Sequence, residues 1–266
     1  MQITVIIPTY NEAENLPKLV SALFSLPLDL RALIVDDNSP DGTGEIADAL
    51  SAEYPDKVEV LHREGKLGLR TAYLTGIQLA LATQADAVVQ MDADFSHNPD
   101  RLVDMAEMIK NRDVVLGSRY VPGGRVDENW PLWRKWLSAF GNFYARTILG
   151  FKLRDVTTGF RFWRRETLEG MPLDRIQSNG YVFLVEMIYM AYSLGYRVGE
   201  VPIYFADRRT HFNIHTCCFR CITQSFTYRT HAAFDHGGPV EPIDITHAPV
   251  EITKNGVWRS GAHMGT

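Results

Sequence analysis

The sequence has few cysteines and no long apolar run. Its 266 residues include three cysteines, all between Cys217 and Cys221, and such clustering is a poor framework for disulfides. The best candidate for a membrane span, from Val182 to Leu194, is interrupted by Glu186 and falls short of the ~20 residues that a span requires. We therefore expect a protein that touches a membrane only from outside.

The chain also lacks a basic excess and an N-terminal signal. Its formal net charge of -5 argues against a general nucleic-acid binder, which would need a positive surface. Met1 leads directly into the β-rich segment Ile3–Ile7, with no signal region before it. A hydrophobic content of 45% is ordinary for a globular protein. We expect a cytoplasmic protein with no nucleic-acid partner.

Short β-rich segments alternate with helical patterns through the first half of the chain. The strand candidates are Ile3–Pro8, Arg31–Asp36, Val58–Leu61, Ala87–Met91 and Val114–Gly117. The helix candidates between them are Glu12–Phe24, Gly44–Tyr54, Gly68–Leu81 and Asp100–Lys110. This alternation predicts an α/β fold with a Rossmann-like, mostly parallel sheet flanked by helices, and with ligands outside the carboxyl ends of the strands.

Polar motifs follow each of the first four predicted strands. They are Pro8–Glu12, Asp36–Thr43, Gly65–Leu69 and the carboxylate pair Asp92 and Asp94. Any one of them would pass as a turn with helix-capping residues. Four such motifs at one edge of one sheet favour a shared binding site.

The carboxylate pair follows a short apolar run that predicts a buried strand. On an extended strand, Asp92 and Asp94 would point to the same face. Two acids there are costly unless a positive group accompanies them, and Mg²⁺ favours one or two carboxylates plus phosphate oxygens. The pair therefore indicates a divalent ion that holds a diphosphate, with a solvated Asp-x-Asp turn as the alternative.

The segment from Trp130 to Leu149 predicts a helix rich in aromatic and basic residues. Its apolar residues keep helical spacing at positions 133, 136, 137, 140, 144 and 148. One interpretation is a helix packed on the sheet, and the other is a helix at a membrane surface with Trp, Arg and Lys at headgroup level. A helix over Tyr181–Leu194 and a strand over Val198–Phe205 are predicted to follow.

The composition changes from about Thr210. Six of the eight histidines and all three cysteines lie after Arg209. The spacing from His211 to Cys221 invites a zinc interpretation, but it lacks a second spaced ligand pair. We expect one domain over residues 1–209 and an irregular or poorly ordered tail over residues 210–266.

Together the motifs resemble those of family 2 glycosyltransferases, and within that family those of the dolichyl- and polyprenol-phosphate mannose synthases. The resemblance covers about residues 2–209 and rests on Pro8–Glu12, Val35–Thr43, Asp92–His97, Gly117–Tyr120, Gly159–Arg161, Gly180–Phe183 and Glu200–Ile203. It implies a GT-A catalytic domain that inverts the sugar as it moves mannose from GDP-mannose to a polyprenyl (dolichyl-type) phosphate. It also implies a peripheral protein at the cytosolic face of a membrane, and leaves open a separate membrane-anchoring partner protein.

Position by position, the resemblance implies a donor site and an acceptor site. The donor would contact Pro8, Tyr10, Glu12, Val35, Asp37, Asp92, Ala93, Asp94, Arg119 and Arg208, with Mg²⁺ or Mn²⁺ on Asp92 and Asp94. The acceptor phosphate would contact Arg119, Arg134 and Ser138. On this view the catalytic residues are Asp94, Arg119 and Arg134.

The resemblance ends after Arg208. Relatives continue into a Gly-x-Ser-Lys segment whose lysine also touches the donor phosphates, whereas here Ile214 stands in the place of that lysine. A donor loop without this cation predicts slow turnover. Two alternatives stay open: a sister enzyme that uses a UDP-sugar, and a donor-binding protein with impaired turnover.

Overall fold

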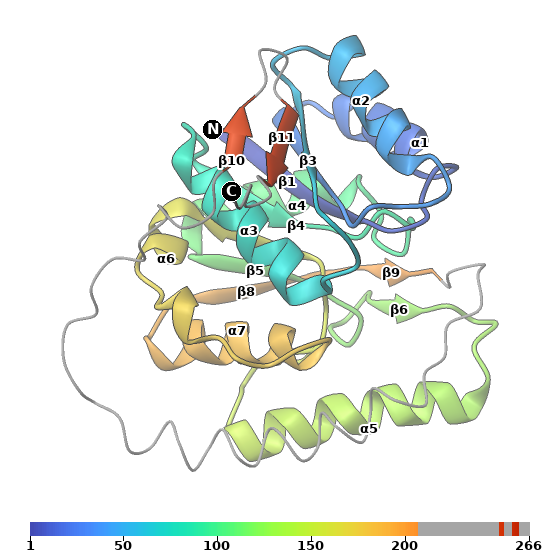
Figure 1. The fold of residues 1–266 in the computed structure, drawn as a ribbon. Helices are drawn as coiled ribbons and strands as arrows, with labels where there is room; N and C mark the ends of the chain where they lie inside the picture. Colours follow the sequence, from blue (N-terminus) through green and yellow to red (C-terminus); the bar gives the residue numbers. More distant parts are fainter. Residues whose placement is uncertain (207–249, 253–256, 261–266) are drawn as a thin grey trace. The chain divides into compact units, whose positions relative to one another are not determined.

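The computed structural model describes residues 1–206, 250–252 and 257–260, and the chain forms two compact units. The first unit comprises Met1–Asp94 with Glu241–Thr266, and the second comprises Phe95–Val240. Figure 1 shows the helices and strands of both. The predicted boundary at residue 209 lies outside the described residues, so it stays a prediction.

The first unit is built on parallel strands. These are β1 (Gln2–Thr9), β2 (Asp29–Asp36), β3 (Val58–His62) and β4 (Ala87–Gln90), with two short strands from the tail, β10 (Val250–Ile252) and β11 (Val257–Ser260). Their order is β10-β11-β3-β2-β1-β4, and only the β10–β11 pair among them is antiparallel.

Three helices connect the strands of this unit: α1 (Leu16–Phe24), α2 (Thr43–Glu53) and α3 (Leu69–Ala82). The first two connections step in one direction across the sheet and the third steps back past β1, so right-handed crossovers place α1 and α2 on one face and α3 on the other. A side-chain carbon at Gly76 of α3 would lie 2.6 Å from Ile6 Cγ2, so glycine allows α3 to lie close against β1.

The second unit contains a smaller set of strands. In it β5 (Val114–Ser118) lies between β7 (Arg161–Arg164), which is antiparallel to it, and β8 (Val198–Pro202), which is parallel. A separate parallel pair is formed by β6 (Arg125–Val126) and β9 (Tyr204–Phe205). The helices are α4 (Arg101–Met108), η1 (Ile109–Asn111), α5 (Leu132–Leu149), α6 (Arg165–Glu169), η2 (Leu173–Arg175) and α7 (Val182–Ser193).

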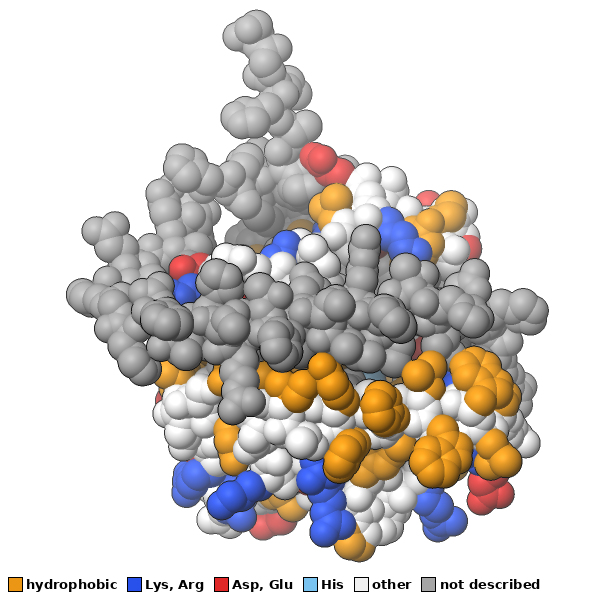
Figure 2. Space-filling model, turned by 90° about the horizontal axis from the view of Figure 1, so that it is seen from below, with side chains coloured by type: hydrophobic (Ala, Val, Ile, Leu, Met, Phe, Trp, Pro, Cys, Tyr) orange, Lys and Arg blue, Asp and Glu red, His pale blue; other side chains and the backbone are white. Residues whose placement is uncertain are grey.

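Helix α5 leaves its large apolar side chains exposed. Only Asn142 and Ala145 of this helix are buried, whereas Trp133 and Trp136 are 55% and 75% exposed. Figure 2 shows hydrophobic side chains gathered on the face that carries α5, with Lys and Arg side chains near its edge. The interpretation that this helix packs its aromatic stripe on the sheet is therefore wrong.

The predicted fold class is confirmed. Each strand and helix predicted between Ile3 and Gly117 is present, with ends that move by a few residues. The strand predicted over Val198–Phe205 divides after Pro202, because β8 pairs with β5 whereas β9 pairs with β6. Of the tail predicted to be irregular, the structure describes only β10 and β11, which the sequence did not predict. Within the described part of the chain, no helix combines the length and apolarity needed to cross a bilayer.

Candidate active site

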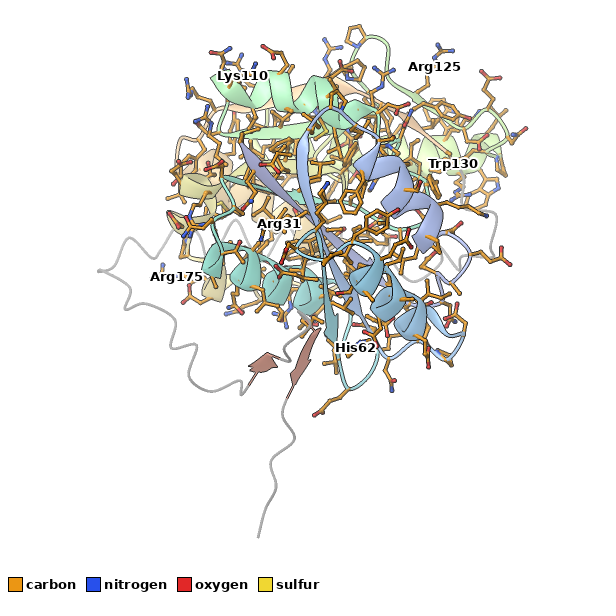
Figure 3. All side chains as sticks on the ribbon, turned by 90° about the horizontal axis from the view of Figure 1, so that it is seen from above. Arg31, His62, Lys110, Arg125, Trp130 and Arg175 are labelled. Carbon is orange, nitrogen blue, oxygen red and sulfur yellow. The ribbon has the colours of Figure 1, made fainter. Side chains whose placement is uncertain are left out.

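The carboxyl ends of β1, β2 and β4 bring most of the predicted donor residues to one edge of the first unit. Pro8 is paired with Val35 in the register of β1 and β2. On the other side of β1 lies β4, and the direction of the connections reverses between them. Figure 3 shows the strands of this unit between the helices of its two faces. In open α/β sheets, ligands bind at such a switch point.

The loops that follow β1 and β2 are held together by hydrogen bonds. The backbone N–H of Glu12 donates to Thr43 Oγ1 at 2.9 Å, and that of Ala13 donates to Asp41 Oδ2 at 3.2 Å. Burial alone would raise the pKa of Asp41, but hydrogen bonds from Thr43 and Ala13 hold this pKa below its ordinary value. Asp41 and Thr43 therefore shape the loops around Glu12.

Asp37 is a buried carboxyl group directly after the end of β2. Arg63 Nη1 lies 2.9 Å from its Oδ1, and the backbone N–H of Gly68 donates to its Oδ2 at 3.4 Å. Burial raises the pKa of Asp37 above its ordinary value, although the Arg63 charge acts in the opposite direction. Asp37 is thus fixed in position by the loop that follows β3.

Asp92 and Asp94 lie in the loop after β4, not on the strand. Because β4 ends at Gln90, the prediction that strand alternation orients the two carboxylates is wrong. A contact orients one of them instead: the hydroxyl of Tyr73, fully buried in α3, donates to Asp92 Oδ1 at 3.0 Å. Both carboxylates are half-buried, and Ala93 between them is buried.

Positive φ angles occur in the loops that follow three of these strands. Of the four non-glycine residues with positive φ in the described residues, Asn11, Asn38 and Phe95 lie in the loops after β1, β2 and β4. For a bulky residue such as Phe95, with φ of 59°, this conformation is an outlier. Such strain persists where the surrounding structure imposes it, and it concentrates at functional sites.

The Asp92 and Asp94 pair fits one kind of metal site. In the described ranges, no group of three or more His, Cys, Asp or Glu side chains is placed to hold an ion. Mg²⁺ commonly takes one or two carboxylates and completes its coordination with water and substrate phosphates. The pair suits an ion that binds together with a diphosphate, and the His211–Cys221 spacing considered for zinc lies outside the described residues.

Arg119, in the second unit, is held by Asp155. Its backbone N–H and its Nε donate to Asp155 Oδ2 at 3.0 and 2.8 Å, and its Nη2 donates to Oδ1 at 2.8 Å and to Thr157 Oγ1 at 2.7 Å. Burial alone would lower the pKa of Arg119, but the Asp155 charge outweighs it and raises this pKa. The arginine is a permanently charged group in a fixed orientation.

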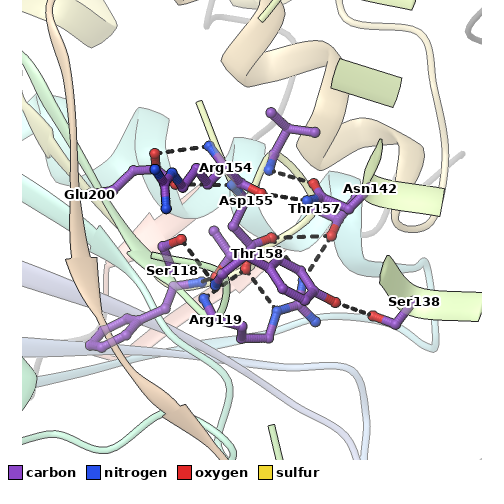
Figure 4. A network of polar contacts seen from close by, with 12 residues as sticks. Ser118, Arg119, Ser138, Asn142, Arg154, Asp155, Thr157, Thr158 and Glu200 are labelled. Atoms are coloured by element: carbon purple, nitrogen blue, oxygen red, sulfur yellow. Dashed lines mark hydrogen bonds and ion pairs between the residues drawn. The ribbon is translucent and has the colours of Figure 1, made fainter. Parts of the chain in front are cut away.

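Further hydrogen bonds connect this arginine with α5 and β8 (Figure 4). Glu200 accepts the backbone N–H of Asp155 at 2.9 Å, and the Asn142 amide bonds to Arg154 O and accepts the N–H of Val156 at 3.0 Å. One turn earlier on the same helix face, Ser138 Oγ lies 2.9 Å from the hydroxyl of Tyr120, the residue after Arg119. The buried side of α5 is therefore fixed to the loops that position Arg119.

Arg134 is placed by an aromatic ring. Its guanidinium lies 3.9 Å from the ring centroid of the buried Trp130 and is itself half-buried in the first turns of α5. Ser138 is four residues further along the helix, so the two side chains share a face. The structure thus brings the predicted acceptor residues Arg119, Arg134 and Ser138 onto two connected segments of the second unit.

Sequence reasoning missed several positioning residues, and Arg208 and Ile214 lie outside the described residues. The missed residues include Tyr73, which bonds to Asp92, and Asn142 and Glu200, which bond to the backbone of the segment that carries Asp155. The signal for Tyr73 and Asn142 was a polar atom on the buried face of a helix. That signal does not identify the partner, because the partners lie 19 and 14 residues away.

Comparison with known proteins identifies a matching family and similar proteins. The model of glycosyl transferase family 2 matches residues 4–171. An undecaprenyl-phosphate mannosyltransferase of Micrococcus luteus is 46% identical over 208 residues, covering 78% of this chain and 85% of the relative. A polyprenol monophosphomannose synthase of Mycolicibacterium smegmatis is 45% identical over 205 residues, covering 77% of each chain.

Solved structures share the fold at low identity. A mannosyl-3-phosphoglycerate synthase from Rubrobacter xylanophilus has a TM-score of 0.62 and 16% identity, over 98% of this chain and 86% of that one. A mannosyltransferase from Pyrobaculum calidifontis, in complex with GDP-mannose and Mn²⁺, has a TM-score of 0.57 and 18% identity, over 90% and 66% of the two chains. These similarities confirm a GT-A type fold.

Proposed function

Because the chain belongs to glycosyl transferase family 2, we propose that it transfers mannose from GDP-mannose to a polyprenyl phosphate. The observation that carries this proposal is the identity of 45–46% with two polyprenyl-phosphate mannosyltransferases over more than three quarters of the chain. The carboxylate pair and the buried Asp37 at the switch point of the first unit support a nucleotide-sugar donor.

The acceptor determines the chemistry. A phosphate monoester has a second pKa of about 6, so it is mostly dianionic at neutral pH and attacks without a general base. Its oxygen forms a bond to C1 of mannose, while the bond from C1 to the GDP oxygen breaks and GDP leaves with the electron pair. Attack opposite the leaving group converts the α-linked sugar into a β-phosphomannosyl lipid. A bound Mg²⁺ or Mn²⁺ would stabilise the charge on the departing diphosphate.

Two arginines would contribute to acceptor binding. Asp155 balances the charge of Arg119, whose Nη1 makes no hydrogen bond within residues 1–206 and is the group that remains for a phosphate oxygen. The Arg134 guanidinium, stacked on the Trp130 ring one turn before Ser138, can donate charge-assisted hydrogen bonds to the acceptor phosphate.

Replacing Arg134 with alanine should raise KM for the polyprenyl phosphate by about tenfold to a hundredfold, because a charge-assisted hydrogen bond is lost. The KM for the sugar nucleotide should stay within about twofold, since no donor contact is removed. Steady-state kinetics with each substrate varied in turn measures both constants, and Arg175→Ala, at an exposed arginine in η2 of the same unit, is the matched control. An equal rise in both KM values would refute the division of the site.

The exposed face of α5 supports a peripheral position at a membrane, which we place at its cytosolic face. Beside the two tryptophans it exposes Leu132, Phe140 and Phe143, and the helix also carries Arg134, Lys135 and Arg146. Aromatic and basic residues together are typical of helices that lie in the interface of a bilayer. Since this face is part of the chain itself, we expect the isolated protein to bind vesicles without a separate anchoring protein.

Vesicle co-sedimentation tests this surface. The double variant Trp133→Ser/Trp136→Ser should weaken binding to anionic vesicles by at least about tenfold, because two large apolar side chains no longer enter the interface. Leu194→Ser, which removes an exposed apolar residue just after α7, should bind like the wild type. Undiminished binding of the double variant would exclude α5 as the membrane-binding face.

Titration calorimetry with GDP and UDP, each with Mg²⁺, tests the donor. We expect tighter binding of GDP, and preferential binding of UDP would instead assign the chain to the sister enzymes that use UDP-sugars. Binding of GDP-mannose without transfer to any polyprenyl phosphate would support a donor-binding protein with impaired turnover.

A further inference from the structure

The loop between β3 and α3 is anchored at both of its ends. At the start, Arg63 Nη1 lies 2.9 Å from Asp37 Oδ1, and Glu64 O accepts a hydrogen bond from Asn38 Nδ2 at 3.3 Å. At the end, the backbone N–H of Gly68 donates to Asp37 Oδ2 at 3.4 Å. The loop is therefore fixed to the residues that follow β2, and only its tip is left without these anchors.

The tip, residues 65–67, places a lysine over a predicted donor-binding residue. Lys66 Nζ lies 3.8 Å from the ring centroid of Tyr10. Tyr10 follows β1 and Lys66 follows β3, with β2 between them, so the loop reaches across the end of β2 to make this contact. The chain then turns into α3 at Gly68, whose φ of 94° lies in the left-handed region that favours glycine.

The charge of Lys66 is not neutralised where it lies. The neighbouring Arg63 is paired with Asp37, whereas Lys66 forms no ion pair with the residues that the structure describes. A cation–π contact at an exposed site is weaker than a charge-assisted hydrogen bond to a phosphate. An anionic ligand at this edge would therefore draw the ammonium group away from the ring.

We propose that Lys66 binds the diphosphate of the nucleotide donor. Before the nucleotide binds, its ammonium group covers the Tyr10 ring; on binding, it moves to a phosphate oxygen and leaves the ring to the nucleoside. Lys66 thereby brings positive charge to the edge at which the diphosphate would bind. This inference rests on the proposed function, and it adds a donor contact from the Gly65–Leu69 motif.

Calorimetric titrations of guanosine, GMP and GDP, all with Mg²⁺, test this assignment. In Lys66→Gln the affinity for GDP should fall by at least about tenfold, while that for guanosine should change by no more than about twofold. Lys66→Arg should retain most of the GDP affinity because it retains the charge. The matched control is Lys57→Gln, because Lys57 Nζ also lies over an aromatic ring of the same unit, 5.5 Å from the ring centroid of Phe24. This replacement should leave the affinity for GDP unchanged.

The outcomes separate this inference from the function on which it rests. Equal affinity of wild type and Lys66→Gln for GDP would overturn the role of Lys66 and leave the proposed function standing. Equal losses for guanosine and GDP would also overturn it, because the lysine would then serve the nucleoside and not the phosphates. A wild-type protein that binds neither GDP nor UDP would overturn the proposed function itself. If UDP binds instead of GDP, the uridine series gives the same comparison.

Discussion

Replacing Asp94 with asparagine should lower kcat/KM by about a thousandfold or more, since the metal's charge stabilisation is worth several kcal/mol. Asparagine keeps the shape of the side chain but removes the negative charge that holds a divalent ion. Stability should change little, because Asp94 is half-buried in a loop. Steady-state kinetics measures the fall in kcat/KM. An independent readout is the rise in Tm that Mn²⁺ causes in the presence of GDP, and this rise should be absent in the variant.

A matched control for this variant is Asp100→Asn. Asp100 is exposed, lies six residues further along, and makes no side-chain hydrogen bond at the start of α4. The Asp100→Asn variant should keep the wild-type activity and the Mn²⁺-dependent rise in Tm. Retention of the Mn²⁺-dependent rise in Tm by Asp94→Asn would refute the metal assignment.

Replacing Asp155 with alanine should lower the free energy of unfolding by about 3–5 kcal/mol, because it leaves a buried guanidinium without its counter-charge. The Asp155 side chain is fully buried and that of Arg119 is 9% exposed, so water does not replace the lost partner. Urea unfolding at neutral pH measures the effect. Arg197→Ala, which breaks the exposed ion pair with Asp113, should destabilise much less and is the control.

The pH dependence of the Asp155 variant follows from the direction of its pKa shift. Burial alone would raise the pKa of Asp155, but the Arg119 charge outweighs it and lowers this pKa below the ordinary value of about 4. The pair therefore contributes its full stability above the unfolded pKa and loses it as the pH falls through the folded pKa. The difference between wild type and Asp155→Ala should be constant near neutral pH and shrink below about pH 4. A difference that grew on acidification would contradict the pairing.

The sequence was sufficient for β1 to β4 and the helices between them because their signals are local. The run from Ile3 to Ile7 is buried without interruption, and a strand covered on both faces has a continuous apolar pattern. The motifs that follow β1, β2 and β4 could be assigned to one edge because the carboxyl ends of parallel strands lie together. β6 was not predicted, because a strand of two residues is too short to show an alternating pattern of apolar and polar residues.

The contacts that orient the site could not be predicted, because they join residues far apart in the sequence. Asp155 is 36 residues from Arg119, and Tyr73 is 19 residues from Asp92. Helix α5 shows a second kind of ambiguity. Helical spacing of apolar residues is the same for a core helix and for an interfacial helix, so only the exposure of Trp133 and Trp136 separates them.

The transfer of mannose to a lipid phosphate is tested most directly by one assay with radiolabelled GDP-mannose and vesicles that contain a polyprenyl phosphate. The proposed function predicts a labelled product that partitions with the lipid, carries a β-linked mannose, and forms with the wild type but not with Asp94→Asn. Absence of a lipid-linked product from the wild type, or its formation from a UDP-sugar and not from GDP-mannose, would contradict the proposal.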